Sequence, residues 1–159
     1  MLTRVDDVSE AMLARWNIQG VALDLDNTIV PWHTTEISEA IHTWVDRVRA
    51  RNIRICLLTN NYLPHVRAVG AALGVPVVRG VLKPWRGAYA AALRELGTEP
   101  ARTLAIGDQL FTDVLGAKAA GMKAVVVQPL SRREFFTTKL LRMFERPVYA
   151  CLRRGVANG

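Results

Sequence analysis

The chain has 159 residues, half of them hydrophobic and 22% charged, with a formal net charge of +7. This composition predicts a folded chain rather than a disordered one, and the length suits one domain with a core of its own. The two cysteines suggest no disulfide framework, and no stretch reaches the roughly 18 apolar residues that a membrane-spanning helix needs. Acidic residues interrupt the N-terminus, which does not resemble a signal peptide, so a cytoplasmic protein is expected.

The positive charge is concentrated near the C-terminus. Residues 131–159 hold seven basic and two acidic side chains, which gives +5, whereas residues 1–130 carry only +2. A basic end favours an anionic partner such as a membrane surface, a nucleic acid or an acidic protein. We therefore divide the chain into a domain over 1–130 and a basic tail over 131–159.

Apolar runs and amphipathic segments alternate along the domain. The first run, 21–30, predicts a buried strand, and helical spacing follows over 35–51 with Thr35 as the expected cap. Further strands are expected at 53–60, 75–82, 102–108 and 123–130, and helices at 63–74, 83–96 and 109–121. This alternation predicts an α/β fold in which a parallel sheet of about five strands has helices on both faces.

Two acids stand inside the first apolar run. Side chains on a strand alternate, so Asp24 and Asp26 are expected on the same side of the sheet. Two carboxylates at about 4 Å repel by about 4 kcal/mol at an effective dielectric constant near 20. A cation, a shared proton or a position at the open end of the strand would offset this cost.

Polar side chains gather where the predicted strands end. Ligands of parallel sheets bind at this edge, near the point where the strand order reverses. Acids, hydroxyls, amides and a lysine from four strands would meet there, so the sequence predicts a functional site. Its members are Asp24, Asp26, Thr28, Thr59, Asn60, Asn61, Lys83, Asp108 and Asp113.

Other polar and aromatic residues are expected to be structural. Asn27 is expected to form a turn, Gly107 to allow a close approach of the backbone, and Trp44 to lie in the core. The three histidines, His33, His42 and His65, show no metal-ligand spacing, so they are expected to be solvated or packed.

Four motifs occur in a fixed order: Asp-x-Asp-x-Thr, Thr-Asn, Lys-Pro and Gly-Asp-x4-Asp. Over about residues 18–128 they resemble the four motifs of the haloacid dehalogenase (HAD) superfamily, which implies a HAD-like Rossmannoid fold. The stretches DLDNTIVPW, LKPW and GDQLFTDVLGA further resemble subfamily IIIA phosphatases of the YqeG type. That group is similar to phosphatidylglycerophosphate phosphatases.

The resemblance implies roles for the acids. Asp24 would be the nucleophile that forms an aspartyl-phosphate, and Asp26 would be the general acid and then the general base. Mg²⁺ would be held by Asp24, Asp108 and the main-chain carbonyl of Asp26. Asp113 would not bind the metal directly but would orient Lys83 or a metal-bound water.

The resemblance also implies how phosphate is bound. Thr59, Asn60 and nearby backbone N–H groups would bind phosphoryl oxygens. Lys83 would neutralise the charge that spreads over these oxygens in the transition state. The acid at Asp26 favours phosphoester chemistry, because the branch that cleaves carbon–halogen bonds lacks an acid at this position.

The predicted loops leave no room for a cap domain. In this superfamily caps are inserted after the first or third strand, where this chain has about one helix and a few residues respectively. An uncovered site suits a substrate too large to enclose, such as a lipid headgroup, a nucleic acid end or a protein side chain.

The tail predicts a basic amphipathic helix that Pro147 should kink or divide. Its apolar residues recur every fourth position between basic ones: Phe136, Leu140, Phe144, Val148 and Leu152. Such a helix can lie on an anionic membrane through residues 131–154, as at the inner face of the cell membrane. The same stripe could equally pack on the sheet or on a second subunit.

The favoured function is Mg²⁺-dependent hydrolysis of phosphatidylglycerophosphate to phosphatidylglycerol. Two alternatives remain open: a phosphatase of soluble monoesters such as nucleotides or sugar phosphates, and a nucleic-acid-binding or assembly protein with an incidental phosphatase site. Few aromatic residues are interleaved with the basic ones and no known nucleic-acid motif occurs, which disfavours a nucleic acid partner.

Overall fold

The computed structural model describes residues 1–32, 34–80 and 82–131. The predicted amphipathic helix of the tail falls almost wholly on 132–159 and so lies outside the described residues.

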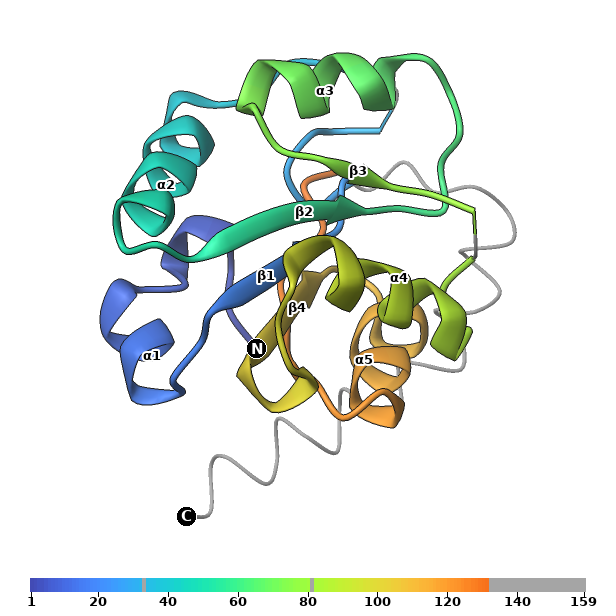
Figure 1. Cartoon of the computed structure of the whole chain (residues 1–159). Helices are drawn as coiled ribbons and strands as arrows, with labels where there is room; N and C mark the ends of the chain where they lie inside the picture. The colour runs from blue at the N-terminus through green and yellow to red at the C-terminus, as the bar shows by residue number, and fades with distance from the viewer. Residues whose placement is uncertain (33, 81, 132–159) are drawn as a thin grey trace, which may run out of the picture.

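The fold is built on a parallel sheet of five strands in the order β3-β2-β1-β4-β5 (Figure 1). β1 is central: the chain first builds β2 and β3 on one side of it and then β4 and β5 on the other. The strand order therefore reverses beside β1, where parallel sheets bind their ligands. The strands are β1 (Gly20–Leu23), β2 (Arg54–Leu58), β3 (Val77–Val78), β4 (Thr103–Gly107) and β5 (Lys123–Val126).

Helices cover both faces of the sheet, which confirms the predicted α/β architecture. One face carries α1, α2 and α3, and the other carries α4 and α5 (Figure 1). The α-helices are α1 (Glu10–Arg15), α2 (Glu39–Ala50), α3 (His65–Leu73), α4 (Arg86–Leu96) and α5 (Gly116–Ala119). Two 3₁₀ turns, η1 (Val5–Asp7) and η2 (Pro100–Arg102), and one π-helical segment, η3 (Leu110–Leu115), complete the described elements.

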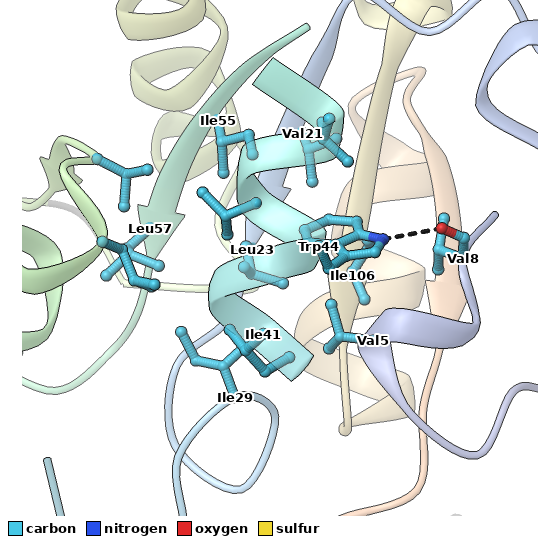
Figure 2. Close-up of a cluster of buried hydrophobic side chains, with 14 of the residues drawn as sticks. Val5, Val8, Val21, Leu23, Ile29, Ile41, Trp44, Ile55, Leu57 and Ile106 are labelled. Carbon is cyan, nitrogen blue, oxygen red and sulfur yellow. Dashed lines mark hydrogen bonds between the residues drawn. The ribbon is translucent and has the colours of Figure 1, made fainter. Parts of the chain in front are cut away.

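The two faces are packed differently. Large branched side chains such as Val21 and Leu23 pack against α2, where Trp44 is buried as expected and donates a hydrogen bond to the Val8 carbonyl at 2.8 Å (Figure 2). The opposite face carries small residues, among them Ala22 and Cys56, which let α4 and α5 approach the sheet closely. This alternation along β1 is what a strand covered on both sides requires.

Some predicted boundaries are wrong. The first strand ends at Leu23 rather than running to residue 30, and the cap of α2 is Ser38 rather than Thr35. The third strand has only two residues, and the segment after β4 begins as a π-helix rather than an α-helix.

No cap domain is inserted in the part of the chain that the structure describes. Between β1 and β2 lie one loop and α2, and between β3 and α4 lies one loop. Among the described residues no helix is long and apolar enough to cross a bilayer.

Candidate active site

Asp24 and Asp26 lie just beyond the carboxyl end of β1 rather than within it. The Asp24 N–H still donates to the Ile106 carbonyl of β4 at 2.8 Å, so Asp24 continues the line of the strand. The chain then turns through Asn27, whose φ of 59° confirms that it forms a turn. The acids thus stand at the open end of the strand, one of the three placements that would offset their repulsion.

The carboxylate of Asp24 is buried and held through both oxygens. Oδ1 accepts a hydrogen bond from Lys83 Nζ at 2.6 Å, and Oδ2 accepts one from Thr28 Oγ1 at 2.9 Å. Thr28 comes from the same turn, whereas Lys83 comes from the loop after β3. Two donors from different loops therefore fix the orientation of this carboxylate.

Lys83 is buried between two acids. Its ammonium lies 2.6 Å from Asp24 Oδ1 and 2.6 Å from Asp113 Oδ1. Burial alone lowers the pKa of Lys83, but the charges of Asp113 and Asp24 outweigh it and raise this pKa above its ordinary value. Lys83 is therefore a permanent positive charge at the edge of the sheet.

Asp113 reaches the site from η3. Its Oδ2 accepts a hydrogen bond from the Gln109 N–H at 3.0 Å while its Oδ1 accepts from Lys83. Gly107 allows this approach: a Cβ built on it would lie 2.2 Å from Asp113 Cγ. The close approach of the backbone expected at Gly107 is confirmed, and the group that lies against this backbone is the Asp113 side chain.

Three buried carboxylates form a cluster that could hold a cation. Oxygens of Asp24, Asp108 and Asp113 lie within 4.8 Å of one another. A set of oxygen donors suits hard divalent cations, and the single ammonium of Lys83 does not neutralise three carboxylates. The residues therefore fit a divalent metal ion.

Thr59 and Asn60 follow β2 at the same edge. Thr59 is buried, and its Oγ1 accepts a hydrogen bond from the Asn61 N–H at 3.0 Å, which leaves the hydroxyl hydrogen to be donated. The side-chain amide of Asn60 instead binds the main chain of Lys83. If Asn60 contacts phosphate, its main-chain N–H would therefore make the hydrogen bond, because its side chain is already bound to Lys83.

Two polar residues at the site had no predicted role of their own. Asn61 Nδ2 donates to Asp26 Oδ2 at 2.8 Å, and His65 Nε2 lies 3.6 Å from Asp26 Oδ1. His65, expected to be solvated or packed, begins α3 four residues after Asn61. A polar pair at that spacing directly after a strand-end Thr-Asn motif is the signal that could have identified them.

The Asp26 carboxyl lies in a different environment from Asp24. Burial raises the pKa of Asp26 above its ordinary value, the Asn61 hydrogen bond opposes this, and the charge of Asp24 adds to it. Asp26 therefore retains a proton more readily than an exposed aspartate does.

The family of the chain follows from its similarity to known proteins. The sequence model of the haloacid dehalogenase-like hydrolases matches residues 37–121, more than half of the chain. A probable phosphatase YqeG of Bacillus subtilis is 29% identical over 92% of this chain and 86% of its own length. A chloroplastic and mitochondrial phosphatidylglycerophosphate phosphatase 1 of Arabidopsis thaliana is 26% identical over 93% of this chain, which spans only 44% of that protein.

Solved structures share the fold. An uncharacterized protein from Corynebacterium glutamicum superimposes with a TM-score of 0.62 at 20% identity, covering 72% of this chain and 88% of its own. The cobalt-bound deoxy-D-mannose-octulosonate 8-phosphate phosphatase of Haemophilus influenzae gives 0.59 at 21% identity, covering 69% and 68%. The chain therefore belongs to the haloacid dehalogenase-like hydrolase family, among its phosphatases, and is a phosphoric monoester hydrolase.

Proposed function

We propose that this phosphatase removes the phosphate of a lipid headgroup, that of phosphatidylglycerophosphate, in a Mg²⁺-dependent reaction through an aspartyl-phosphate on Asp24. The observation that carries the mechanism is the fixed carboxylate of Asp24 at the open sheet edge, with Lys83 on one oxygen and Thr28 on the other. A nucleophile held by short hydrogen bonds needs little further ordering before it attacks.

The proposed reaction has two steps that Asp24 and Asp26 share. A carboxylate oxygen of Asp24 attacks phosphorus, the bond to the leaving oxygen breaks, and that oxygen takes the proton of Asp26. A water then attacks the aspartyl-phosphate, gives its proton to Asp26 and releases inorganic phosphate and the Asp24 carboxylate. The raised pKa of Asp26 supports this role, because the first step needs a protonated carboxyl.

The remaining residues would bind phosphate and metal. The Thr59 hydroxyl and the Asn60 N–H would donate to phosphoryl oxygens, and Lys83 would offset their charge. Asp24, Asp108 and the Asp26 carbonyl would hold Mg²⁺, with Asp113 kept on Lys83. Mg²⁺ would supply positive charge at the phosphoryl oxygens.

Exposed apolar side chains support a lipid substrate. Among the described residues, four large ones lie in the loops that follow β2 and β3: Tyr62, Leu63, Leu82 and Trp85. Trp85 is the most exposed, at 69%. Tyr and Trp favour membrane–water interfaces, so this apolar rim suits a headgroup whose acyl chains stay outside the site.

The start of the tail also supports a membrane partner. Leu130 and Ser131 are hydrogen-bonded to Asn27 in the turn after β1: Leu130 N donates to the Asn27 carbonyl at 2.8 Å and Ser131 Oγ donates to Asn27 Oδ1 at 2.7 Å. The basic segment 131–159 therefore starts at the edge that carries the site and the rim. We propose that 1–130 is the catalytic domain and that the tail holds it at an anionic membrane surface from the cytoplasmic side.

The test is phosphate release from phosphatidylglycerophosphate in mixed micelles, set against soluble phosphomonoesters, with MgCl₂ or EDTA. We expect lipid-selective, Mg²⁺-dependent release that Asp24→Asn abolishes. The control Asp46→Asn, on the exposed face of α2, should keep it. Turnover of soluble esters alone would remove the lipid assignment, and no release from any ester would contradict the proposed chemistry. Salt-sensitive nucleic acid binding in that last case would favour a binding protein.

A further inference from the structure

Asp24 and Asp26 are held by separate sets of side chains. Lys83 and Thr28 hold Asp24, whereas Asn61 and His65 contact Asp26. Asn61 follows β2 and His65 begins α3, so the contacts to Asp26 come from chain about 35 residues away from it. A change at Asn61 or His65 can therefore disturb Asp26 without removing a contact of Asp24.

The Asn61 side chain is fixed in one orientation by its own loop. Its Oδ1 accepts a hydrogen bond from the Leu63 N–H at 2.9 Å, and its main-chain N–H donates to Thr59 Oγ1 at 3.0 Å. Because Leu63 N is a donor, it requires the oxygen of the Asn61 amide. The Nδ2 group must then face Asp26, to which it donates at 2.8 Å.

His65 lies beside the second oxygen of the Asp26 carboxyl. Its Nε2 lies 3.6 Å from Asp26 Oδ1 and 3.3 Å from Asn61 Nδ2, and its side chain is 17% exposed. The ring thus lies beside the carboxyl oxygen that Asn61 does not bind. Both residues are only part-buried, whereas Val66 and Val69 anchor α3 to the core.

We infer that Asn61 and His65 are positioning residues that aim the Asp26 carboxyl at the leaving-group oxygen. This inference rests on the proposed role of Asp26 in proton transfer. A proton moves from the carboxyl O–H to the leaving oxygen as the P–O bond breaks, and this transfer requires hydrogen-bond distance and alignment. A carboxyl free to rotate loses that alignment while Asp24 can still attack.

Leaving groups of different basicity provide the test. An alkoxide leaves only with a proton, whereas 4-nitrophenolate leaves without one. Turnover of phosphatidylglycerophosphate and of 4-nitrophenyl phosphate is therefore measured in the same micelles for wild type, Asn61→Leu, His65→Gln and Asp26→Asn. His42→Gln, which changes a part-exposed histidine on α2, is the matched control.

We expect Asn61→Leu and His65→Gln to slow turnover of the alkyl ester, phosphatidylglycerophosphate, about tenfold. Turnover of the aryl ester, 4-nitrophenyl phosphate, should fall less than about threefold. Asp26→Asn should change the ratio of the two rates in the same direction and by a larger factor. His42→Gln should change neither rate. The ratio of the two rates comes from one preparation, so a partly unfolded variant does not distort it.

Equal losses on both esters, or no loss on either, would overturn the inference while leaving the proposed function intact. If wild type released phosphate from neither ester, the proposed function would fail and the positioning role with it. Retention of the wild-type ratio in Asp26→Asn would remove Asp26 as the acid and overturn the inference on its own.

Discussion

The side-chain amide of Asn60 forms two hydrogen bonds with the main chain of Lys83. Its Oδ1 accepts from the Lys83 N–H at 2.6 Å, and its Nδ2 donates to the Lys83 carbonyl at 3.0 Å. This pair joins the loops that follow the neighbouring strands β2 and β3. It fixes the main-chain position from which the Lys83 ammonium reaches Asp24 and Asp113.

Replacing Asn60 should therefore impair turnover rather than substrate binding. We expect Asn60→Ala to lower kcat about tenfold with little change in KM, because Lys83 loses its fixed position while the backbone N–H of residue 60 remains. Asn60→Asp keeps the acceptor for Lys83 N and should give an intermediate kcat. Steady-state kinetics on one ester separate the two quantities. A raised KM at unchanged kcat would show that the Asn60 side chain binds phosphate directly.

Gly107 should not tolerate a side chain. In Gly107→Ala the new Cβ would lie 2.2 Å from Asp113 Cγ and 2.6 Å from Asp113 Cβ, so Asp113 must move away from Lys83. We expect the free energy of unfolding to fall by about 1–3 kcal/mol and kcat to fall at least about tenfold. Urea denaturation and kcat per folded molecule measure the two effects.

Gly121→Ala serves as the comparison. Its Cβ would lie at an ordinary 3.4 Å from Pro100 Cβ, but the φ of 81° strains any side chain and should destabilise the protein by a similar amount, about 1–3 kcal/mol. Since Gly121 lies just before β5 rather than in a loop of the site, kcat should be kept. Equal loss of kcat in both variants would mean that Asp113 is not the reason for the glycine at position 107.

The sheet could be predicted because its strands are buried on both faces. Their apolar runs stand out from the amphipathic helices, and Gly74 and Gly97 mark helix ends with φ values of 62° and 58°. The local boundaries could not be read in the same way. Thr35 and Ser38 are both good caps, and burial of Ile41 and Trp44 against the sheet decides between them. The single turn of η1 is too short for a periodic pattern.

The carboxylates of the site could also be predicted, because acids at the ends of apolar strands are conspicuous. The amide and imidazole contacts could not, since they depend on how loops fold back. Asn60 and Asn61 are adjacent and chemically identical, yet one binds the main chain of Lys83 and the other binds Asp26. The sequence contains both residues but not the direction in which each side chain points.

Cys56 provides a pH dependence that is separate from the site. Burial, with a smaller contribution from the charge of Glu95, raises the pKa of the Cys56 thiol to about 12, from an ordinary value of 9.0. The unfolded chain therefore loses this proton first as pH rises above 9, and stability falls between about pH 9 and 12. The test compares the single variant Cys151→Ser with the double variant Cys151→Ser/Cys56→Ala. Between pH 8 and 10.5 the free energy of unfolding should drop by about 2 kcal/mol more in the single variant, which keeps Cys56, than in the double variant. Identical pH dependence with and without Cys56 would contradict this burial effect.

Lys83 should link stability to the divalent cation. Lys83→Met leaves the buried carboxylates of Asp24 and Asp113 without their shared cation, and removing one partner of a buried ion pair costs about 3–5 kcal/mol. In EDTA we therefore expect a lower Tm than wild type, and in MgCl₂ we expect turnover reduced at least about 100-fold. The control Lys118→Met, exposed on α5, should match wild type in both respects.

Addition of MgCl₂ distinguishes repulsion from simple loss of packing. A divalent ion held by Asp24 and Asp108, close to the Asp113 carboxylate, would offset more uncompensated charge in Lys83→Met than in wild type, so the rise in Tm should be larger in the variant. Differential scanning calorimetry at matched ionic strength, with KCl in place of MgCl₂, separates specific binding from screening. An equal rise in both proteins would show that Lys83 and the metal act independently. A rise with KCl alone would show that screening, rather than a bound ion, relieves the repulsion.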